Sequence, residues 1–450
     1  MSLKNSLKYI RKKSFSVNIF GLGYVGFPLA VKLASEGIKI LGIDVNKERL
    51  ERLKKNNLMD SEIHLEKEFI NSVSKNNLSF SLEPTNSENC QIAIICVPTP
   101  IPSKDITSDI FVKSAVEKFL TVAKKGDIII LESSIEVGTT ENIQKLIENS
   151  YNVGNDFGLA FCPERIDPAN KEWSIENIPR VIYCSDDNTF EICKIIYQNV
   201  NDGNLIRVEL PKIAEVVKSF ENAFRLVNIS LVNQLAMLCD KLGIDVKRVI
   251  DVAATKPFGF MPHYPGAGAG GHCIPKDPRF LLNAAKKAGV SFSTIENALE
   301  INLLIPNYIA TSISNSLNSK KLDKKVLIWG LTYKANVEDM RDSPSFKLAT
   351  ELMKKNIRVF GYDPFFNNEF VEKYLIENNL KKINFEVVDT VTEDLLQSIS
   401  CICVVQHHEE VEKKLIETYD NSKVPFIFDC QSKLIKNPNS STILDYLGSK

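Results

Sequence analysis

A glycine-rich segment with a single cysteine is the first place in this chain where the residue types suggest chemistry. It reads PGAGAGGHCIPKDP over residues 265–278, and Cys273 is followed closely by Lys276 and Asp277. Its glycines let the backbone wrap closely around a ligand, and a thiol beside a cation can be held as the nucleophilic thiolate. Taken alone, the segment fits equally well with a glycine-rich linker that carries an incidental buried cysteine.

A second glycine motif lies near the N-terminus, between a predicted strand and a predicted helix. Its glycines are Gly21, Gly23 and Gly26, and Asp44 ends the next predicted strand. Glycines at this spacing permit a tight turn, close backbone approach to a pyrophosphate and close helix packing, and the acid accepts hydrogen bonds from the adenosine ribose. Because Asp44 would repel a 2′-phosphate, the motif predicts NAD rather than NADP. The alternative is a glycine-rich turn in a different doubly wound fold.

The two motifs together favour the catalytic interpretation of the cysteine. A thiolate next to NAD is what aldehyde oxidation needs, because it adds to the carbonyl and the thiohemiacetal can then deliver hydride. The other cysteines are scattered, mostly in apolar runs, and only Cys401 and Cys403 are close together. Strand alternation puts these two on one face, where we expect them to pack as small hydrophobes. No spacing of cysteines and histidines is typical of a zinc site, so no metal is expected.

The elements that must position these motifs follow an α/β, helical, α/β order. This order predicts two Rossmann-like doubly wound parallel-sheet domains joined by a helical central domain. Apolar residues at three- and four-residue steps predict one long helix over 211–242, typical of a spine between domains or a subunit interface. The predicted domains are 1–205, 206–318 and 319–450. Strands are expected at 16–20, 38–44, 92–97, 128–131, 325–330, 358–362, 402–405 and 426–429, and further helices at 27–34, 278–288 and 294–318.

Length, charge and composition exclude several classes of function. The 450-residue chain has 55 Lys+Arg against 56 Asp+Glu, a formal net charge of -1, so it has no overall basic field for nucleic acid. No apolar run approaches the roughly 18 residues of a membrane span. The basic N-terminus lacks the apolar stretch of a signal peptide. We therefore expect a cytoplasmic protein with reduced thiols and neither a membrane nor a nucleic-acid partner.

Seven motifs along the chain occur in the order that is typical of one family. They are GLGYVGFPLA (21–30), CVPTP (96–100), ESSIEVGTT (132–140), CPERIDPAN (162–170), EVVKSFENAF (215–224), GGHCIPKDP (270–278) and GLTYKANVEDMRDSPS (330–345). By these motifs the chain resembles the UDP-glucose/GDP-mannose dehydrogenases, the nucleotide-sugar 6-dehydrogenases, over nearly its whole length. The resemblance implies an N-terminal NAD domain, a central helix at a dimer interface and a C-terminal nucleotide-sugar domain, in a homodimer or higher homo-oligomer.

The resemblance also implies a reaction, the four-electron oxidation of C6 of a UDP-sugar with two NAD used in succession. The alcohol becomes an aldehyde, is trapped on Cys273, is oxidised to a thioester and is hydrolysed to the uronic acid. Lys218 would stabilise oxyanion charge beside Asn222, one helical turn away. Asp277 would help to activate water, and Glu164 resembles the carboxylate that serves thioester hydrolysis. The alternatives are a solvated helix surface for Lys218 and Asn222, and an ion pair for Glu164.

The same motifs imply which residues contact the two ligands. NAD contacts are expected from Gly21, Gly23, Tyr24, Val25, Gly26, Asp44, Arg49, Val97, Pro98, Thr99, Ser134 and, in the C-terminal domain, Arg341. UDP-sugar contacts are expected from Tyr264, Gly268, Gly270 and Lys334. For the two arginines and Lys334 the alternative is an ordinary solvated side chain. His272 is left out of the catalytic set, because the backbone direction can point it away from Cys273.

Two positions depart from the family pattern. Ile135, followed by Glu136, stands in a turn where Thr or Pro is usual, which puts water positioning by a hydroxyl there in doubt. Gln431 stands where an arginine is usual, so a sugar or phosphate contact from that arginine cannot be carried over.

The substrate sugar is predicted by resemblance within the family, and two other classes of protein stay open. The segment at 255–262, the GGHC form of the cysteine loop and CPERIDPAN resemble the UDP-N-acetylglucosamine dehydrogenase branch. UDP-N-acetylmannosamine differs only in C2 configuration, and UDP-glucose is third. A two-electron hydroxyacid dehydrogenase would share the architecture but needs no thiol. A catalytically silent nucleotide-sugar sensor would bind the UDP-sugar without reducing NAD.

Overall fold

The chain forms two compact units in a computed structural model that describes residues 2–87, 89–100, 109–167, 170, 172–378, 380 and 386–449. Unit 1 comprises Met1–Glu221 with Arg279–Val290, and unit 2 comprises Asn222–Pro278 with Ser291–Lys450. The predicted helical middle is therefore divided between the two units. The predicted domain boundaries at 205/206 and 318/319 stay predictions.

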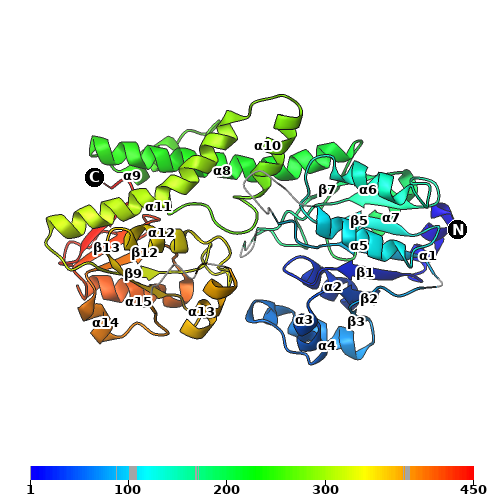
Figure 1. Cartoon of the computed structure of the whole chain (residues 1–450), viewed down its shortest axis with the longest axis horizontal. Coiled ribbons are helices and arrows are strands. Elements are labelled where there is room, and N and C mark those ends of the chain that lie inside the picture. The colour runs from blue at the N-terminus through cyan, green and yellow to red at the C-terminus, as the bar shows by residue number, and fades with distance from the viewer. Residues whose placement is uncertain are drawn as a thin grey trace. The chain divides into compact units, whose positions relative to one another are not determined.

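Unit 1 is built on an eight-stranded sheet with the order β3-β2-β1-β4-β5-β6-β7-β8 (Figure 1). Strand β7 runs antiparallel to β6, and the other neighbouring strands pair in parallel. The order reverses between β1 and β4, which is the switch point where doubly wound sheets bind ligands. The strands are β1 (Ser16–Phe20), β2 (Lys39–Ile43), β3 (Leu78–Ser81), β4 (Gln91–Ile95), β5 (Ile128–Leu131), β6 (Gly158–Phe161), β7 (Arg180–Cys184) and β8 (Leu205–Val208).

Helices cover both faces of this sheet, as a mostly parallel sheet requires. Along β4, Ile92 and Ile94 belong to one buried cluster, whereas Ala93 and Ile95 belong to the cluster on the opposite face. The helices are α1 (Leu3–Arg11), α2 (Gly26–Ser35), α3 (Lys47–Lys54), the 3₁₀ helix η1 (Asp60–Leu65), α4 (Glu66–Ser74), α5 (Ile110–Leu120), α6 (Thr139–Ile147) and α7 (Asp187–Tyr197).

The sequence indicates no element before Ser16, and the structure corrects this with helix α1. Leu3, Ser6 and Ile10 are its buried positions. The Ser6 hydroxyl donates a hydrogen bond of 2.7 Å to the Gly126 carbonyl. The segment resembles a solvated basic tail because three inward positions are too few to stand out among its lysines.

Unit 2 repeats the doubly wound design with a six-stranded, all-parallel sheet of order β11-β10-β9-β12-β13-β14. Its strands are β9 (Lys325–Trp329), β10 (Arg358–Tyr362), β11 (Glu386–Val387), β12 (Cys401–Val404), β13 (Phe426–Asp429) and β14 (Ile443–Tyr446). Its helices are α9 (Val246–Ala253), α11 (Ser293–Ser319), α12 (Pro344–Met353), α13 (Asn368–Glu377), α14 (Glu393–Ser398) and α15 (Glu409–Asp420).

Two long-range features of the sequence are confirmed. Helix α8 spans Pro211–Leu242 as predicted, and it and α10 (Asp277–Lys287) each pass from one unit to the other. Cys401 and Cys403 lie in the same buried cluster, as strand alternation predicts. The expected fold class is confirmed, and each predicted element is present to within two residues at its ends.

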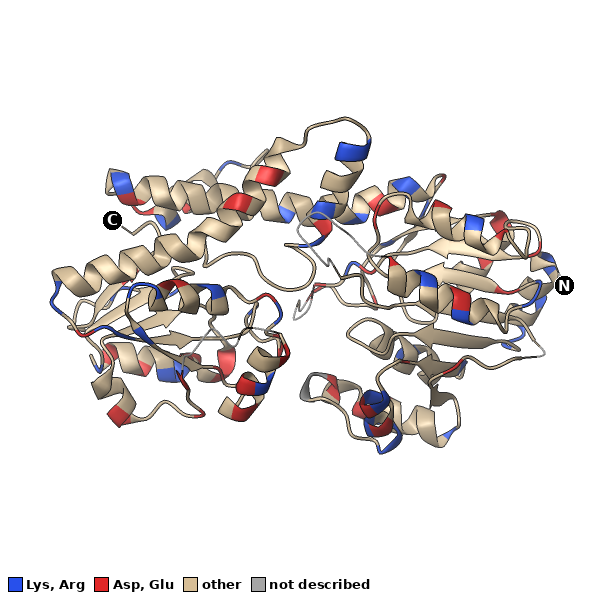
Figure 2. Cartoon of the chain, viewed as in Figure 1, with Lys and Arg blue, Asp and Glu red and all other residues tan. Residues whose placement is uncertain are grey.

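Positively and negatively charged residues are mixed in the structure, as the nearly neutral composition suggests. Figure 2 shows Lys and Arg interspersed with Asp and Glu along the helices of both units. Within the described ranges, no helix combines the length and the apolar character that crossing a membrane requires.

Candidate active site

The glycine motif of unit 1 forms the turn between β1 and α2. Gly21 has a φ of +91°, and a Cβ there would lie 2.7 Å from the Cys96 carbonyl oxygen. A Cβ on Gly26 would collide with the Gly21 carbonyl. A Cβ on Gly23 would meet no atom within 4 Å, so this side of the turn is open. No side chain caps α2, and the open turn therefore presents backbone N–H groups suited to a pyrophosphate.

Asp44 lies beside this turn at the end of β2. Its Oδ2 accepts the Leu22 N–H at 2.8 Å, and its Oδ1 accepts the Asn46 N–H at 2.8 Å. The carboxylate is only partly buried, so its remaining lone pairs can accept the ribose hydroxyls of a dinucleotide. The turn and this acid together fit NAD.

Arg49 is neither a solvated surface side chain nor an open cation. Its guanidinium makes a two-pronged ion pair with Glu62 and lies 4.8 Å from the centre of the Phe27 ring. Its Nε donates to the Leu22 carbonyl at 3.3 Å. Arg49 therefore holds the glycine turn through the Leu22 carbonyl. Its direct contact with NAD stays a prediction.

The other residues expected around the cofactor lie in the loops after β4 and β5, which are tied to each other. The Thr99 hydroxyl donates to the Ser134 carbonyl at 2.6 Å, and the Ser133 hydroxyl donates to the Val97 carbonyl at 2.6 Å. Pro98 lies exposed between them. The structure thus brings the expected NAD residues of unit 1 to the carboxyl ends of β1, β2, β4 and β5.

The departure after the ESS motif has a structural consequence. Ile135 is buried in the core of unit 1, where a hydroxyl would have no access to water. Glu136 forms an ion pair of 2.6 Å with Lys287. Ile135 therefore supplies no hydroxyl to orient a water molecule at this turn.

Glu164 lies in a buried ion network. Its Oε1 accepts the backbone N–H groups of Arg165 and Ile166 at 2.7 and 2.9 Å, and its Oε2 pairs with the guanidinium of Arg180. Arg180 also pairs with Glu132 at 3.2 Å. The ion pair considered as an alternative is therefore real, although its partner is Arg180 on β7. The last part of the CPERIDPAN motif, residues 168 and 169, lies outside the described residues.

Helix α8 carries both Lys218 and Asn222. Its first turn is anchored by Glu215, which is fully buried and accepts the N–H groups of Gly138 and Thr140 at 2.6 and 2.8 Å. Burial raises the pKa of Glu215, and the Gly138 and Thr140 N–H groups oppose that shift. Lys218 is half-buried, and Asn222 is 7 % exposed, so neither is the solvated residue that the alternative describes.

In unit 2 the residues around Cys273 are joined by hydrogen bonds. The Asn222 amide donates to Asp277 Oδ2 at 2.7 Å, and Lys276 Nζ lies 3.5 Å from Asp277 Oδ1. The Cys273 carbonyl accepts the Asp277 N–H at 2.8 Å. Cys273 is the exposed cysteine, since Cys96 is half-buried and the remaining eight are buried. An exposed thiol in the turn that starts α10 has the access that a nucleophile needs.

The glycine-rich loop before Cys273 packs on the loop that follows β9. The Gly271 N–H donates to the Arg341 carbonyl at 3.0 Å, and a Cβ on Gly270 would lie 2.7 Å from the Asp342 carbonyl oxygen. Asn302 on α11 pairs with both the N–H and the carbonyl of Ala269, at 2.6 and 2.9 Å. The expected substrate residues Gly268, Gly270 and Lys334 therefore belong to two adjoining loops.

Two other predicted contact residues have partners inside unit 2. The Tyr264 hydroxyl donates to Asp251 on α9 at 2.7 Å, and this hydrogen bond raises the pKa of Tyr264. Arg341 pairs with Asp339 at 2.7 Å. Their contacts with ligands stay predictions.

Sequence reasoning missed the buried polar residues that hold these loops. Asp363, at the end of β10, accepts the N–H groups of Leu331 and Thr332 at 2.6 and 3.2 Å. His408 lies 3.2 Å from the same carboxylate oxygen. Asp363 carries a usable signal, because it ends the second strand of unit 2 as Asp44 ends that of unit 1.

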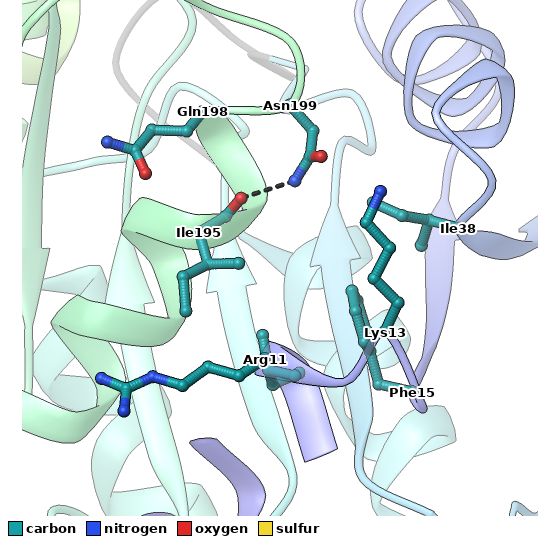
Figure 3. Close-up of a pocket in the computed structure, with 8 residues that line it drawn as sticks. Arg11, Lys13, Phe15, Ile38, Ile195, Gln198 and Asn199 are labelled. Atoms are coloured by element: carbon teal, nitrogen blue, oxygen red, sulfur yellow. Dashed lines mark hydrogen bonds between the residues drawn. The ribbon is translucent and has the colours of Figure 1, made fainter. Parts of the chain in front are cut away.

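A separate pocket of about 250 Å³ lies in unit 1 near the amino ends of β1 and β2 (Figure 3). Phe15 and Ile38, which directly precede β1 and β2, contribute to its wall, and Arg11 and Lys13 line it as well. Figure 3 shows the Asn199 amide turned back to the Ile195 carbonyl, a bond of 2.6 Å. The pocket is at the amino ends of these strands, away from the glycine turn.

Comparison with known proteins finds one family along three segments of the chain. Family models match the NAD binding, central and UDP binding domains of the UDP-glucose/GDP-mannose dehydrogenase family at residues 15–201, 212–303 and 327–436. A UDP-N-acetyl-D-mannosamine dehydrogenase of Methanococcus vannielii is 32% identical over 86% of this chain and 88% of its own length. A UDP-N-acetyl-D-glucosamine 6-dehydrogenase of Pseudomonas aeruginosa is 32% identical over 79% and 84%.

A solved structure supports the same assignment. That of a UDP-D-ManNAc dehydrogenase from Pyrococcus horikoshii superimposes with a TM-score of 0.82 at 27% identity, covering 96% of this chain and 99% of that one.

Proposed function

The chain belongs to the UDP-glucose/GDP-mannose dehydrogenase family and is an NAD-dependent oxidoreductase of the UDP-sugar dehydrogenase type, and from this premise we propose that it oxidises C6 of UDP-N-acetylglucosamine to the uronic acid. UDP-N-acetylmannosamine is the second candidate, since relatives named for that sugar are 32–34% identical to this chain and relatives named for UDP-N-acetylglucosamine are 32% identical. Both candidates carry an N-acetyl group at C2 and differ only in the configuration there. UDP-glucose is the third candidate.

The observation that carries this proposal is the exposed Cys273 beside the Asn222–Asp277 hydrogen bond. NAD, when bound, accepts one hydride in each of two oxidations. After the first, the Cys273 thiolate adds to the aldehyde carbon, and the resulting alkoxide is the species that loses the second hydride. The product of that loss is a thioester on Cys273. Asn222 donates a hydrogen bond to the oxygen on that carbon, and Asp277 accepts one from the attacking water.

The remaining roles follow the chemistry of each group. Lys218 supplies positive charge for the alkoxide of the substrate. Glu164 accepts the proton of the water that hydrolyses the thioester, so that a C–O bond forms, the C–S bond breaks and sulfur leaves as thiolate. NAD is held by the open side of Gly23 and by Asp44, and the UDP-sugar by the Gly268–Gly270 loop with Lys334. The overall reaction consumes one water and two NAD for each carboxylate formed.

A substrate screen tests the function. The purified chain is incubated with NAD and UDP-GlcNAc, UDP-ManNAc, UDP-glucose or UDP-galactose, and NADH and product mass are measured. We expect two NADH for each UDP-N-acetylhexosamine and a product heavier by the conversion of CH₂OH to COOH. The variant Cys273→Ser should stop turnover or retain a covalent adduct, whereas Cys239→Ala, at a buried cysteine of unit 2, should keep it. One NADH per sugar with an active Cys273→Ser variant would reject the proposal, and so would UDP-sugar binding without NADH.

A homodimer or higher homo-oligomer is part of the proposal. Helix α8 exposes apolar side chains at helical spacing, namely Phe220, Phe224, Leu231, Leu238 and Leu242. Exposed apolar side chains gathered along one helix are typical of an interface between copies. Light scattering at micromolar concentration should give at least twice the chain mass of 50.6 kDa, and a monomer would contradict this part.

A further inference from the structure

The ion network under Glu164 has a composition that packing alone does not require. Two carboxylates, Glu132 and Glu164, share one guanidinium, and the three side chains are 0 %, 9 % and 2 % exposed for Glu132, Glu164 and Arg180 respectively. Arg180 Nε has no hydrogen-bond partner among the described residues. Leaving a buried donor unsatisfied costs about 1–3 kcal/mol. Buried ion networks of this kind are often no more stable than apolar side chains of similar volume.

Each member of the network comes from a different element of unit 1. Glu132 follows β5, Arg180 starts β7, Glu164 follows β6, and Tyr197 ends α7. The Tyr197 hydroxyl donates to the Glu132 oxygen that faces Arg180, and the Arg180 guanidinium lies 4.7 Å from the centre of the Tyr197 ring. The sheet therefore fixes the guanidinium in one position, held from two sides.

The two acids beside Arg180 keep its guanidinium charged. Burial alone opposes a charge on Arg180, but Glu164 and Glu132 outweigh it and hold the pKa of Arg180 well above its ordinary value. Burial raises the pKa of Glu132, with Arg180 opposing the shift. The thiols of Cys96 and Cys162 also face this network, and burial raises their pKa values. Arg180 is thus a permanent cation whose hydrogen bonds are divided between two acids.

We propose that Arg180 and Glu132 are positioning residues for Glu164, with Arg180 fixing the orientation of its carboxylate and Glu132 taking up part of the Arg180 charge so that Glu164 still accepts a proton. The inference rests on the proposed function, in which Glu164 takes the proton of the hydrolytic water. Both Glu164 oxygens are occupied, Oε1 by two backbone N–H groups and Oε2 by Arg180, so the plane of the carboxylate is set. A carboxylate whose negative charge was fully compensated by Arg180 would be a poor base.

The hydrolysis step can be separated from the two oxidations by rapid mixing. In Arg180→Lys the charge remains, but the planar guanidinium that bridges Glu132 and Glu164 is lost. We expect the burst of two NADH per site to be retained, steady-state turnover to fall 10- to 100-fold, and the thioester on Cys273 to accumulate in the intact mass spectrum. In Glu132→Gln the competing carboxylate is removed, and turnover should fall 3- to 10-fold, again with the burst retained. Arg207→Lys, at an exposed ion pair with Asp187, should match the wild type.

The possible results distinguish a failure of this inference from a failure of the proposed function. An equal loss of burst and steady-state rate in Arg180→Lys and Glu132→Gln would mean that the network only supports the fold, and it would overturn the inference. Wild-type turnover in both variants would overturn it too. Should Arg180→Lys fail to fold, Glu132→Gln decides alone by the same two readouts. If the wild type reduces no NAD with any UDP-sugar, the proposed function fails instead, and that result is distinct from a positioning failure.

Discussion

The sheets of the two units have the same glycine turn after β1 and β9, but the residues around the two turns differ. Gly21 after β1 and Gly330 after β9 have φ values of +91° and +93°, and each N–H donates 2.8 Å to the carbonyl at the end of the neighbouring strand, Ile43 or Tyr362. The next residue in each unit donates its N–H to the acid beyond that strand, Asp44 or Asp363. Up to this point the two sites are the same structure.

The two acids then differ in what else they contact. Asp44 is partly exposed and keeps room for a ligand, whereas Asp363 is 2 % exposed and lies 3.2 Å from the buried His408. The helices differ as well. In unit 1, α2 begins directly behind the turn at Gly26, whereas in unit 2, α12 begins only at Pro344, after a loop that carries Lys334 and Arg341.

The difference shows how one fold is assigned two ligands. Unit 1 presents a helix N-terminus and an open acid, the arrangement that binds a dinucleotide. Unit 2 encloses its acid and places cations on a long loop, which suits the phosphates of a second nucleotide. We therefore predict that Asp44 is a binding residue and Asp363 a structural one.

The largest expected effect is on the enclosed acid. Asp363→Ala leaves the Leu331 and Thr332 N–H groups and His408 without their acceptor in a buried site, so the free energy of unfolding should fall by about 3 kcal/mol. Asp44→Ala should lower it by only about 1 kcal/mol, because Asn46 is exposed and water can replace the acceptor of its N–H, so that Leu22 alone is left with a freed N–H at a buried residue. Urea unfolding is followed by the fluorescence of the two tryptophans, Trp173 in unit 1 and Trp329, which is buried on β9 in unit 2. Equal losses in the two variants would remove the proposed distinction.

The next effect concerns the choice of coenzyme. Asp44→Ser removes the acceptor for the ribose hydroxyls and the charge that repels a 2′-phosphate, so the ratio of kcat/KM for NAD to that for NADP should fall about 100-fold. Asp363→Ser is the matched control and should leave this ratio unchanged in whatever fraction remains folded. A change of coenzyme preference in the control, or none in Asp44→Ser, would show that the assignment of the two acids is wrong.

The glycines give a smaller effect that also separates stability from binding. Gly21→Ala and Gly330→Ala place a Cβ within 3 Å of backbone atoms at positive φ, so each should lower the free energy of unfolding by more than about 1 kcal/mol. Gly23→Ala meets nothing within 4 Å and should leave stability unchanged, but it should raise the KM for NAD about tenfold, because the Cβ occupies the path of the pyrophosphate. Thermal unfolding and initial rates on the three variants measure both properties. An unchanged KM in Gly23→Ala would place the pyrophosphate elsewhere.

The sequence was sufficient where the signal is local. An apolar strand, a glycine turn and an acid at the next strand end lie within one short segment, so Gly21 to Asp44 could be predicted as a unit. The 3.6-residue period of α8 is equally local and predicts its bounds. The sequence did not predict β3, β6, β7, β8, β11 and β14. Four of these, β3, β8, β11 and β14, are edge strands with partly exposed side chains, and none of the four shows a continuous apolar run.

The polar network around Arg180 could not be predicted, because nothing local joins its members. Glu132 and Arg180 meet across 48 positions, and Asp363 meets Leu331 across 32. Such pairs are created by the order of strands in the sheet, which brings the ends of β5, β6 and β7 together. Glu164 had a local alternative in the ion pair, but the partner that the fold selects is on another strand.

The smallest expected effect is at His272, and it tests the burial of this side chain beside Lys276 and Arg341 in unit 2. Burial, followed by the charges of Lys276 and Arg341, lowers the pKa of His272 from 6.5 to about 3. The imidazole is then neutral in the folded protein at neutral pH, so His272→Gln should leave the pH dependence of kcat/KM unchanged between about pH 5 and pH 8. Because the unfolded chain takes up a proton at this histidine below about pH 6.5, the wild type should lose stability relative to the variant as the pH falls through that value. Rate profiles and urea unfolding at several pH values measure the two. A displaced rate profile in the variant would mean that His272 titrates near neutrality, and the side chain would then be less buried than in this structure.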